Sequence, residues 1–159
     1  MNITNVYKLV FSILICQLAA VGGSLFTRPS IPTWYATLQK PGFNPPNWLF
    51  APVWTILFTL MGISAYLVWS KGFAKREVRI ALSIFGVQLV LNVLWSFFFF
   101  KLRSPFSALI EIVILWVMIL VTVVYFFTVS RAASFLLFPY IAWVSFAVIL
   151  NFYLFKLNL

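Results

Sequence analysis

Few side chains in this 159-residue sequence could perform acid–base or metal chemistry. The chain has no histidine, so it lacks the commonest metal ligand, the usual general base and the usual axial ligand of haem. Its two carboxylates, Glu77 and Glu111, lie on different segments, and Cys16 has no partner at the spacing of metal ligands. We therefore expect no metal site and no resident cofactor.

Aromatic and amide side chains are better candidates, because aromatic residues make up 20% of the chain. The third apolar segment spaces four of them four, three and four positions apart: Gln88, Asn92, Trp95 and Phe99. At 3.6 residues per turn these positions share one helix face. An amide and an indole are thereby brought together.

Two other apolar segments carry faces with the same period. The face of the fifth segment consists of Tyr140, Trp143, Ala147 and Asn151. The small Ala147 leaves room beside Trp143. The second has a face that is large at one end and small at the other: Trp54, Phe58, Gly62 and Ala65. Both faces suit helices that line a cavity.

The depth of these residues supports a shared cavity. Trp54, Asn92 and Trp95 lie six, eight and five residues from the ends of their segments, which is roughly 8 to 12 Å at 1.5 Å per residue. Trp143 lies deeper, near the expected midplane. These side chains would line a pocket in one half of the bilayer, beneath residues 27–47.

The segment 27–47 is restricted in conformation, since it holds five of the eight prolines and is followed by Trp48 and Trp54. Such a segment suggests a lid. We expect its Trp34 and Tyr35 to point inward, toward Trp54 and Trp143.

The elements that position these residues are membrane-spanning helices. The chain is 64% hydrophobic and 8% charged, and its mean hydropathy is +1.08, which a soluble fold of this size could not bury. Five stretches reach the length of about 20 residues that a spanning helix needs: 6–26, 48–69, 80–100, 105–127 and 132–155. We expect an all-α membrane protein, a single domain over 1–159 with five transmembrane helices and a long structured loop.

The net charge of +9 does not indicate nucleic acid, because the eleven Lys and Arg residues are scattered over the helix ends. Anionic lipid head groups are the better partner. Lys and Arg divide six to five between the two sides, which does not decide the orientation.

Two features inside the spans have simple structural explanations. Glu111 would be costly without a partner, and we expect a basic residue of a neighbouring helix to pair with it, such as Lys101, Arg103 or Lys8. The first segment carries small residues on one face, which predicts close helix packing: Ser12, Cys16, Ala19 and Gly23.

Longer motifs point to a family. The loop and second segment read Trp34-Tyr35-x-x-Leu38-x-Lys40-Pro41-x-Phe43-x-Pro45-Pro46-x-Trp48-x-Phe50-x-Pro52-Val53-Trp54. Gln88-Leu89-x-Leu91-Asn92-x-x-Trp95 and Pro139-Tyr140-x-Ala142-Trp143-x-x-Phe146-Ala147 follow in order. Over nearly the whole chain, this pattern resembles the tryptophan-rich sensory protein family, which includes the mitochondrial translocator protein, also called the peripheral-type benzodiazepine receptor.

The resemblance implies a five-helix bundle, commonly a homodimer, that binds porphyrins such as protoporphyrin IX and isoquinoline or benzodiazepine-type ligands under the first loop. With the faces described above, it leads to one set of expected ligand-binding residues: Trp34, Tyr35, Trp54, Phe58, Asn92, Trp95, Tyr140, Trp143 and Ala147. Animal members also carry a sterol-recognition pattern, whose loose form is met here by Leu150, Tyr153 and Lys156. The short tail after Lys156 favours a bacterial cell membrane.

Three functions are compatible with this reading. The first is a receptor or sensor for tetrapyrroles. The second is an enzyme that promotes light- and oxygen-dependent breakdown of bound protoporphyrin, in which Trp54, Trp143 and Tyr35 would pass or trap radicals and Asn92 would orient the ring. The third is transport of porphyrin or sterol, although the sequence lacks the inverted repeat of many transporters.

Overall fold

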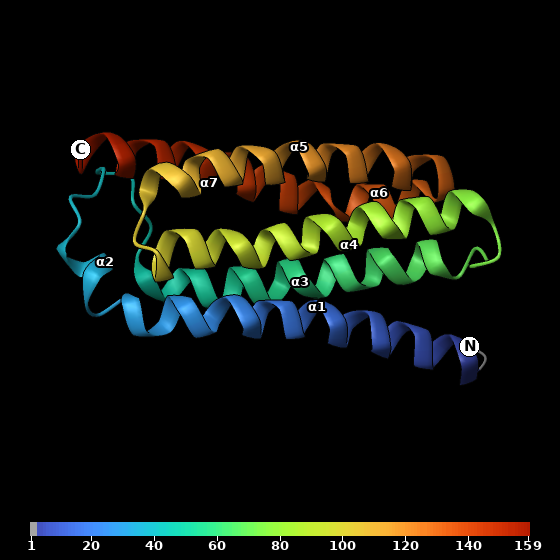
Figure 1. Cartoon of the computed structure of the whole chain (residues 1–159). Helices are drawn as coiled ribbons and strands as arrows, with labels where there is room; N and C mark the ends of the chain where they lie inside the picture. Colours follow the sequence, from blue (N-terminus) through green and yellow to red (C-terminus); the bar gives the residue numbers. More distant parts are fainter. Residues whose placement is uncertain (1–2) are drawn as a thin grey trace.

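The computed structural model describes residues 3–159, and all regular elements within that range are helices (Figure 1). Their bounds are α1 Ile3–Ser30, α2 Trp34–Thr37, α3 Asn47–Trp69, α4 Arg76–Ser96, the π-helix η1 Phe97–Lys101, α5 Pro105–Val129, α6 Arg131–Leu136 and α7 Phe138–Leu157. Five segments are long and apolar enough to cross a membrane: Asn5–Ser30, Asn47–Trp69, Arg76–Lys101, Pro105–Val129 and Arg131–Leu157. The expected class, an all-helical integral membrane protein, is confirmed.

The long helices run along one common direction, and the two ends of the chain lie at opposite ends of the bundle (Figure 1). The short helix α2 and its connecting loops lie at the same end as the C-terminus. This end, called the loop end below, is where the sequence predicts a pocket.

Helix α1 is longer than the expected stretch 6–26 and takes up residues that we assigned to the loop. The backbone N–H of Ile31 still donates to the carbonyl of Thr27 at 3.1 Å. The Thr27 hydroxyl is satisfied inside the helix by the carbonyl of Gly23, also at 3.1 Å. Polar residues therefore continue the helix by about one turn, and the loop spans 31–46 instead of 27–47.

The third spanning segment ends in a π-turn that the sequence reading did not anticipate. The N–H of Leu102 donates to the carbonyl of Phe97 at 3.0 Å, five residues earlier. The wider turn changes the direction of the side chains that follow. Phe99 and Phe100, which lie within this turn, are both buried.

The last spanning segment is interrupted at Leu137, between α6 and α7. Pro139 has no N–H to donate to the preceding turn, and it lies in the first turn of α7, where that loss is tolerated. The hydroxyl of Ser64 on α3 donates to the carbonyl of Ala133 at 2.7 Å. This bond ties the short helix α6 to the bundle.

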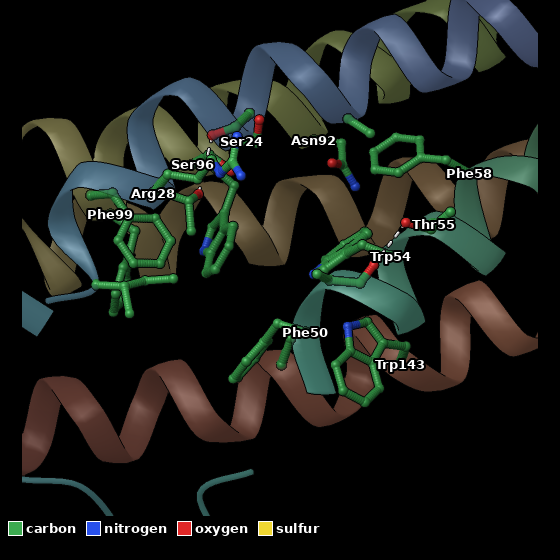
Figure 2. Close-up of a pocket in the computed structure, with 18 of the residues that line it drawn as sticks. Ser24, Arg28, Phe50, Trp54, Thr55, Phe58, Asn92, Ser96, Phe99 and Trp143 are labelled. Atoms are coloured by element: carbon green, nitrogen blue, oxygen red, sulfur yellow. Dashed lines mark hydrogen bonds between the residues drawn. The ribbon is translucent and has the colours of Figure 1, made fainter. Parts of the chain in front are cut away.

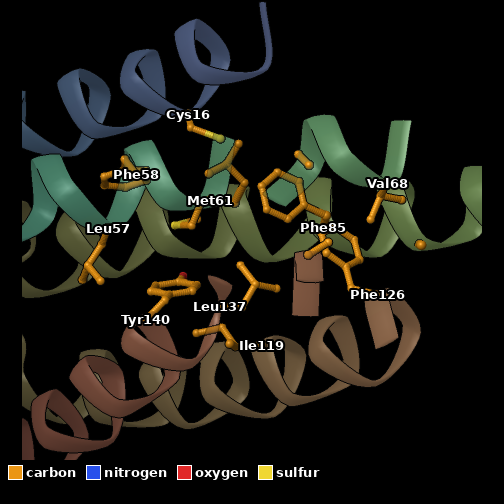
Figure 3. Close-up of a cluster of buried hydrophobic side chains, with 14 of the residues drawn as sticks. Cys16, Leu57, Phe58, Met61, Val68, Phe85, Ile119, Phe126, Leu137 and Tyr140 are labelled. Atoms are coloured by element: carbon orange, nitrogen blue, oxygen red, sulfur yellow. The ribbon is translucent and has the colours of Figure 1, made fainter. Parts of the chain in front are cut away.

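A hydrophobic core fills the bundle away from the loop end (Figure 3). Phe85 and Phe126 stack there at 5.6 Å with an interplanar angle of 23°. Cys16 brings α1 into contact with this core, as Figure 3 shows. The remaining large side chains of the core include Met61, Leu115, Ile119, Leu137 and Tyr140.

Close helix packing occurs at two glycines. A Cβ added to Gly62 on α3 would lie 2.6 Å from the Cα of Ile13 on α1. A Cβ added to Gly23 on α1 would lie 3.1 Å from the Ser96 hydroxyl oxygen on α4. Gly62, which we grouped with the pocket face of its segment, is thus a helix-contact residue.

We expect Gly62→Ala to destabilise the bundle, because the added methyl meets backbone and α1 must move away. Overpacking of this kind costs about 1–3 kcal/mol. The measurement is thermal unfolding in one detergent. Gly86→Ala is the matched control, since its methyl would meet nothing within 4 Å, and equal melting temperatures for the two variants would contradict the close contact.

Candidate functional site

A cavity of about 360 Å³ lies at the loop end of the bundle (Figure 2). Its walls come from α1, α3, α4, η1 and α7, with Tyr35 contributed by α2. Seven of the nine expected ligand-binding residues line it: Tyr35, Trp54, Phe58, Asn92, Trp95, Trp143 and Ala147. The structure thus brings together side chains from four segments that are distant in sequence.

Aromatic rings from α3 and α7 form part of the wall. The ring centroid of Trp143 on α7 lies 6.2 Å from that of Phe50 and 5.6 Å from that of Phe146. Trp54 on α3 lies 5.5 Å from Phe58. Figure 2 shows Trp54 and Trp143 extending from different helices into the same region. Faces of this kind bind flat apolar ligands by stacking.

Trp95 is held in place by polar contacts. Its indole N–H donates to the Asn151 side-chain oxygen at 3.0 Å, and the Asn151 amide donates to the carbonyl of Pro105 at 2.8 Å. Its ring stacks on Phe99 at 5.4 Å. Asn151 therefore fixes the orientation of this wall as well as lining it.

Tyr140 does not line the cavity; it lies behind Asn92, almost completely buried. The Asn92 amide nitrogen donates to the Tyr140 hydroxyl, which donates to the Gln88 side-chain oxygen, both at 2.9 Å. Tyr140 therefore supports the floor of the cavity. The expected face Gln88, Asn92 and Trp95 exists, with Gln88 at its deep end.

The two loop aromatics behave differently. Tyr35 is buried, packs against Phe99 and Phe100, and lines the cavity. Trp34 packs edge-on against Phe99 at 5.4 Å and is not part of the cavity wall. Of these two loop aromatics, Tyr35 is the one that reaches the cavity.

The loop is docked at several points. The Tyr35 hydroxyl donates to the Asn44 side-chain oxygen at 3.0 Å, and the Lys40 ammonium lies 4.7 Å from the Tyr35 ring centroid. The side chain of Asn158 exchanges two hydrogen bonds with the backbone of Gln39, each at 2.9 Å. The C-terminal end of α7 therefore holds the loop over the cavity, a contact that no sequence motif indicated.

The pKa of the Tyr35 hydroxyl is raised above its ordinary value of 10.0, chiefly because burial disfavours the phenolate, with the hydrogen bond to Asn44 opposing the shift. A raised folded-state pKa contributes stability that is full below pH 10 and is lost as the pH rises through the folded-state value. We expect melting temperature to fall more between pH 9 and 11 in the wild type than in Tyr35→Phe. Tyr7→Phe, at an exposed ring, is the control, and equal falls in all three proteins would count against this role.

Helix α1 contributes a whole wall that the sequence reading missed: Gln17, Ala19, Ala20, Val21, Gly23, Ser24, Thr27 and Arg28. The small face of this segment was the available signal, but we interpreted it only as helix packing. Gln17 closes the wall, since its amide donates to Thr59 Oγ1 on α3 at 3.0 Å. Arg28 is exposed at the rim, where Figure 2 shows it near Ser24.

The three residues of the expected sterol pattern, all on α7, have different surroundings. Leu150 is buried and lines the cavity, Tyr153 packs against Phe43 of the loop at 5.3 Å, and Lys156 is exposed. Tyr153 remains 39% exposed, so Leu150 is the buried residue of the three, and the sterol pattern stays a prediction.

The expectation that a basic residue pairs with Glu111 is wrong. Glu111 is buried, and neither of its carboxylate oxygens has a hydrogen-bond partner among residues 3–159. Lys101 and Arg103 are exposed and precede the first residue of α5. They lie roughly 10 Å or more from Glu111 along the helix axis. Lys8 lies over the Trp69 ring at the other end. Glu111 does not line the cavity.

Known proteins match this chain along almost its entire length. It is 45% identical to the Tryptophan-rich protein TspO of Chlorobaculum tepidum, over 97% of this chain and 98% of that one. It is 46% identical to the protein of the same name from Archaeoglobus fulgidus, over 97% and 99% of the two chains, and 38% identical to the human Translocator protein, over 86% and 81%. The TspO/MBR family pattern covers residues 12–157, and the chain belongs to this family.

Proposed function

We propose that this membrane protein is a receptor or sensor that binds tetrapyrroles such as protoporphyrin IX, and isoquinoline or benzodiazepine-type ligands, in the cavity under residues 31–46. The observation that carries the proposal is the cavity itself, walled by Trp54, Trp95, Trp143 and Tyr35. Its volume of about 360 Å³ lies within the usual range of ligand sites, about 300 to 1,000 Å³.

Arg28 is the charged residue of the cavity wall, and it suits a ligand with carboxylates. A flat porphyrin stacked against Trp54 and Trp143 could direct its propionates toward the rim. Lys40, the basic residue of the loop, is engaged with the Tyr35 ring and the carbonyl of Leu38. Arg28 is therefore the better propionate partner.

Filling the cavity tests the proposal. Ala147 lines the cavity on the same helix as Trp143, and we expect Ala147→Phe to weaken protoporphyrin IX binding at least tenfold because the new ring takes the ligand's place. The measurement is the change in porphyrin absorbance on titration into the protein in nanodiscs. Ala142→Phe, at an exposed position of the same helix, is the control. Unchanged affinity in Ala147→Phe would place the ligand elsewhere.

The photo-oxidative and transport alternatives stay predictions, as does the bacterial cell membrane. The homodimer that the resemblance implies also stays a prediction, since the structure is that of one chain.

A further inference from the structure

The polar chain behind the cavity has an unused hydrogen-bonding group at each end. At the deep end, the amide nitrogen of Gln88 is buried and has no partner among residues 3–159. At the cavity end, Asn92 gives its amide nitrogen to Tyr140, and its oxygen accepts no hydrogen bond within the described part of the chain. Asn92 lines the cavity, whereas Tyr140 and Gln88 do not. The Asn92 oxygen is thus the group left for a ligand.

The same three side chains can bond in the opposite direction. A terminal amide turned by 180° exchanges its oxygen and nitrogen with little change of shape, and a tyrosine hydroxyl both donates and accepts. After both amides turn, Gln88 donates to Tyr140 and Tyr140 donates to the Asn92 oxygen. Two hydrogen bonds exist in either direction. The unpartnered atom at Gln88 changes from nitrogen to oxygen, and Asn92 presents its nitrogen to the cavity.

We propose that the Gln88–Tyr140–Asn92 chain makes Asn92 a reversible polar contact, which accepts from ligands with a ring N–H and donates to ligands with a ring nitrogen or carbonyl acceptor. The proposal rests on the proposed function, because it concerns the same cavity. It adds the ligand class: flat aromatic heterocycles of either hydrogen-bonding sense. A free-base porphyrin carries both kinds of nitrogen at its centre.

Gln88 is the residue that permits both directions, although it does not touch the ligand. In Gln88→Leu the buried Tyr140 hydroxyl has one acceptor left, the Asn92 oxygen. Donating there avoids a buried unsatisfied hydroxyl hydrogen, which is costly. Asn92 would then present only its nitrogen to the cavity. Asn92→Leu would remove the contact altogether.

Three tricyclic probes of similar size separate these cases: carbazole donates through N–H, acridine accepts through its ring nitrogen, and anthracene does neither. We would measure their affinities by tryptophan quenching in nanodiscs at pH 8, corrected for partitioning into protein-free nanodiscs. The wild type should bind carbazole and acridine each about fivefold more tightly than anthracene, the effect of one hydrogen bond. Gln88→Leu should keep the acridine advantage and lose that of carbazole. Asn92→Leu should lose both.

Thr122→Val is the control for loss of a buried polar group, because Thr122 lies on α5 outside the cavity and bonds only within its own helix. Its probe preferences should match the wild type. Retained anthracene affinity shows that each variant is folded around its cavity. A wild type that favours only one heterocycle, or a Gln88→Leu protein that still favours both, would overturn the reversible contact. Failure of all three probes to bind saturably would overturn the proposed function instead.

Discussion

Replacing Trp143 by alanine should weaken protoporphyrin IX binding by about 5- to 150-fold, since stacking of a flat ring on an aromatic side chain is worth about 1–3 kcal/mol by alanine substitution. Trp143 packs against both Phe50 and Phe146 and is part of the cavity wall. These neighbours hold the indole in place before the ligand arrives, so little side-chain freedom remains to be lost on binding. Trp143→Phe keeps part of the ring surface and should recover part of the affinity.

The porphyrin's own absorbance is the readout, because removing a tryptophan also changes the intrinsic fluorescence. Trp48→Ala is the matched control: Trp48 has 71% of its surface exposed and does not line the cavity. Its affinity should equal that of the wild type. An equal loss in Trp48→Ala and Trp143→Ala would show a general effect on the bundle, and no loss in either would remove Trp143 from the site.

Glu111→Leu should stabilise the protein, against the usual expectation for a charged residue inside a span. The carboxyl group is buried without a hydrogen-bond partner in the described part of the chain, and an unpartnered buried polar group costs about 1–3 kcal/mol. Leucine has a similar volume and removes that cost. We expect a rise of about 2 to 12 °C in melting temperature with porphyrin affinity unchanged.

Glu111→Gln separates charge from polarity, since it keeps a polar group of the same shape and should gain less than Glu111→Leu. Glu77→Leu is the control, because Glu77 is exposed in the first turn of α4, where a negative charge is favourable. It should give no stabilisation. A lower melting temperature in Glu111→Leu would mean that the carboxyl has a partner outside the chain.

Much of the cavity follows from helical period alone. Asn92 and Trp95 share a face because their spacing matches the helix repeat, and the same holds for Trp143 and Ala147. The period does not say which residues of a face reach the cavity. Tyr140 shares a face with Trp143, yet it lies behind Asn92 and does not line the cavity. Depth along a helix sets the height of a side chain, but its neighbours decide what it touches.

The sequence by itself determined the five apolar segments, their helical form and the faces that carry Trp54, Asn92 and Trp143, because hydrophobic length and the 3.6-residue repeat are local properties. Only the tertiary structure decided which small residues of α1 touch a helix and which border an open space. The same composition serves both, as Cys16 packs into the hydrophobic core while Ala19 and Gly23 of the same face line the cavity. The docking of the loop on Asn158 and the isolation of Glu111 likewise depend on partners distant in sequence.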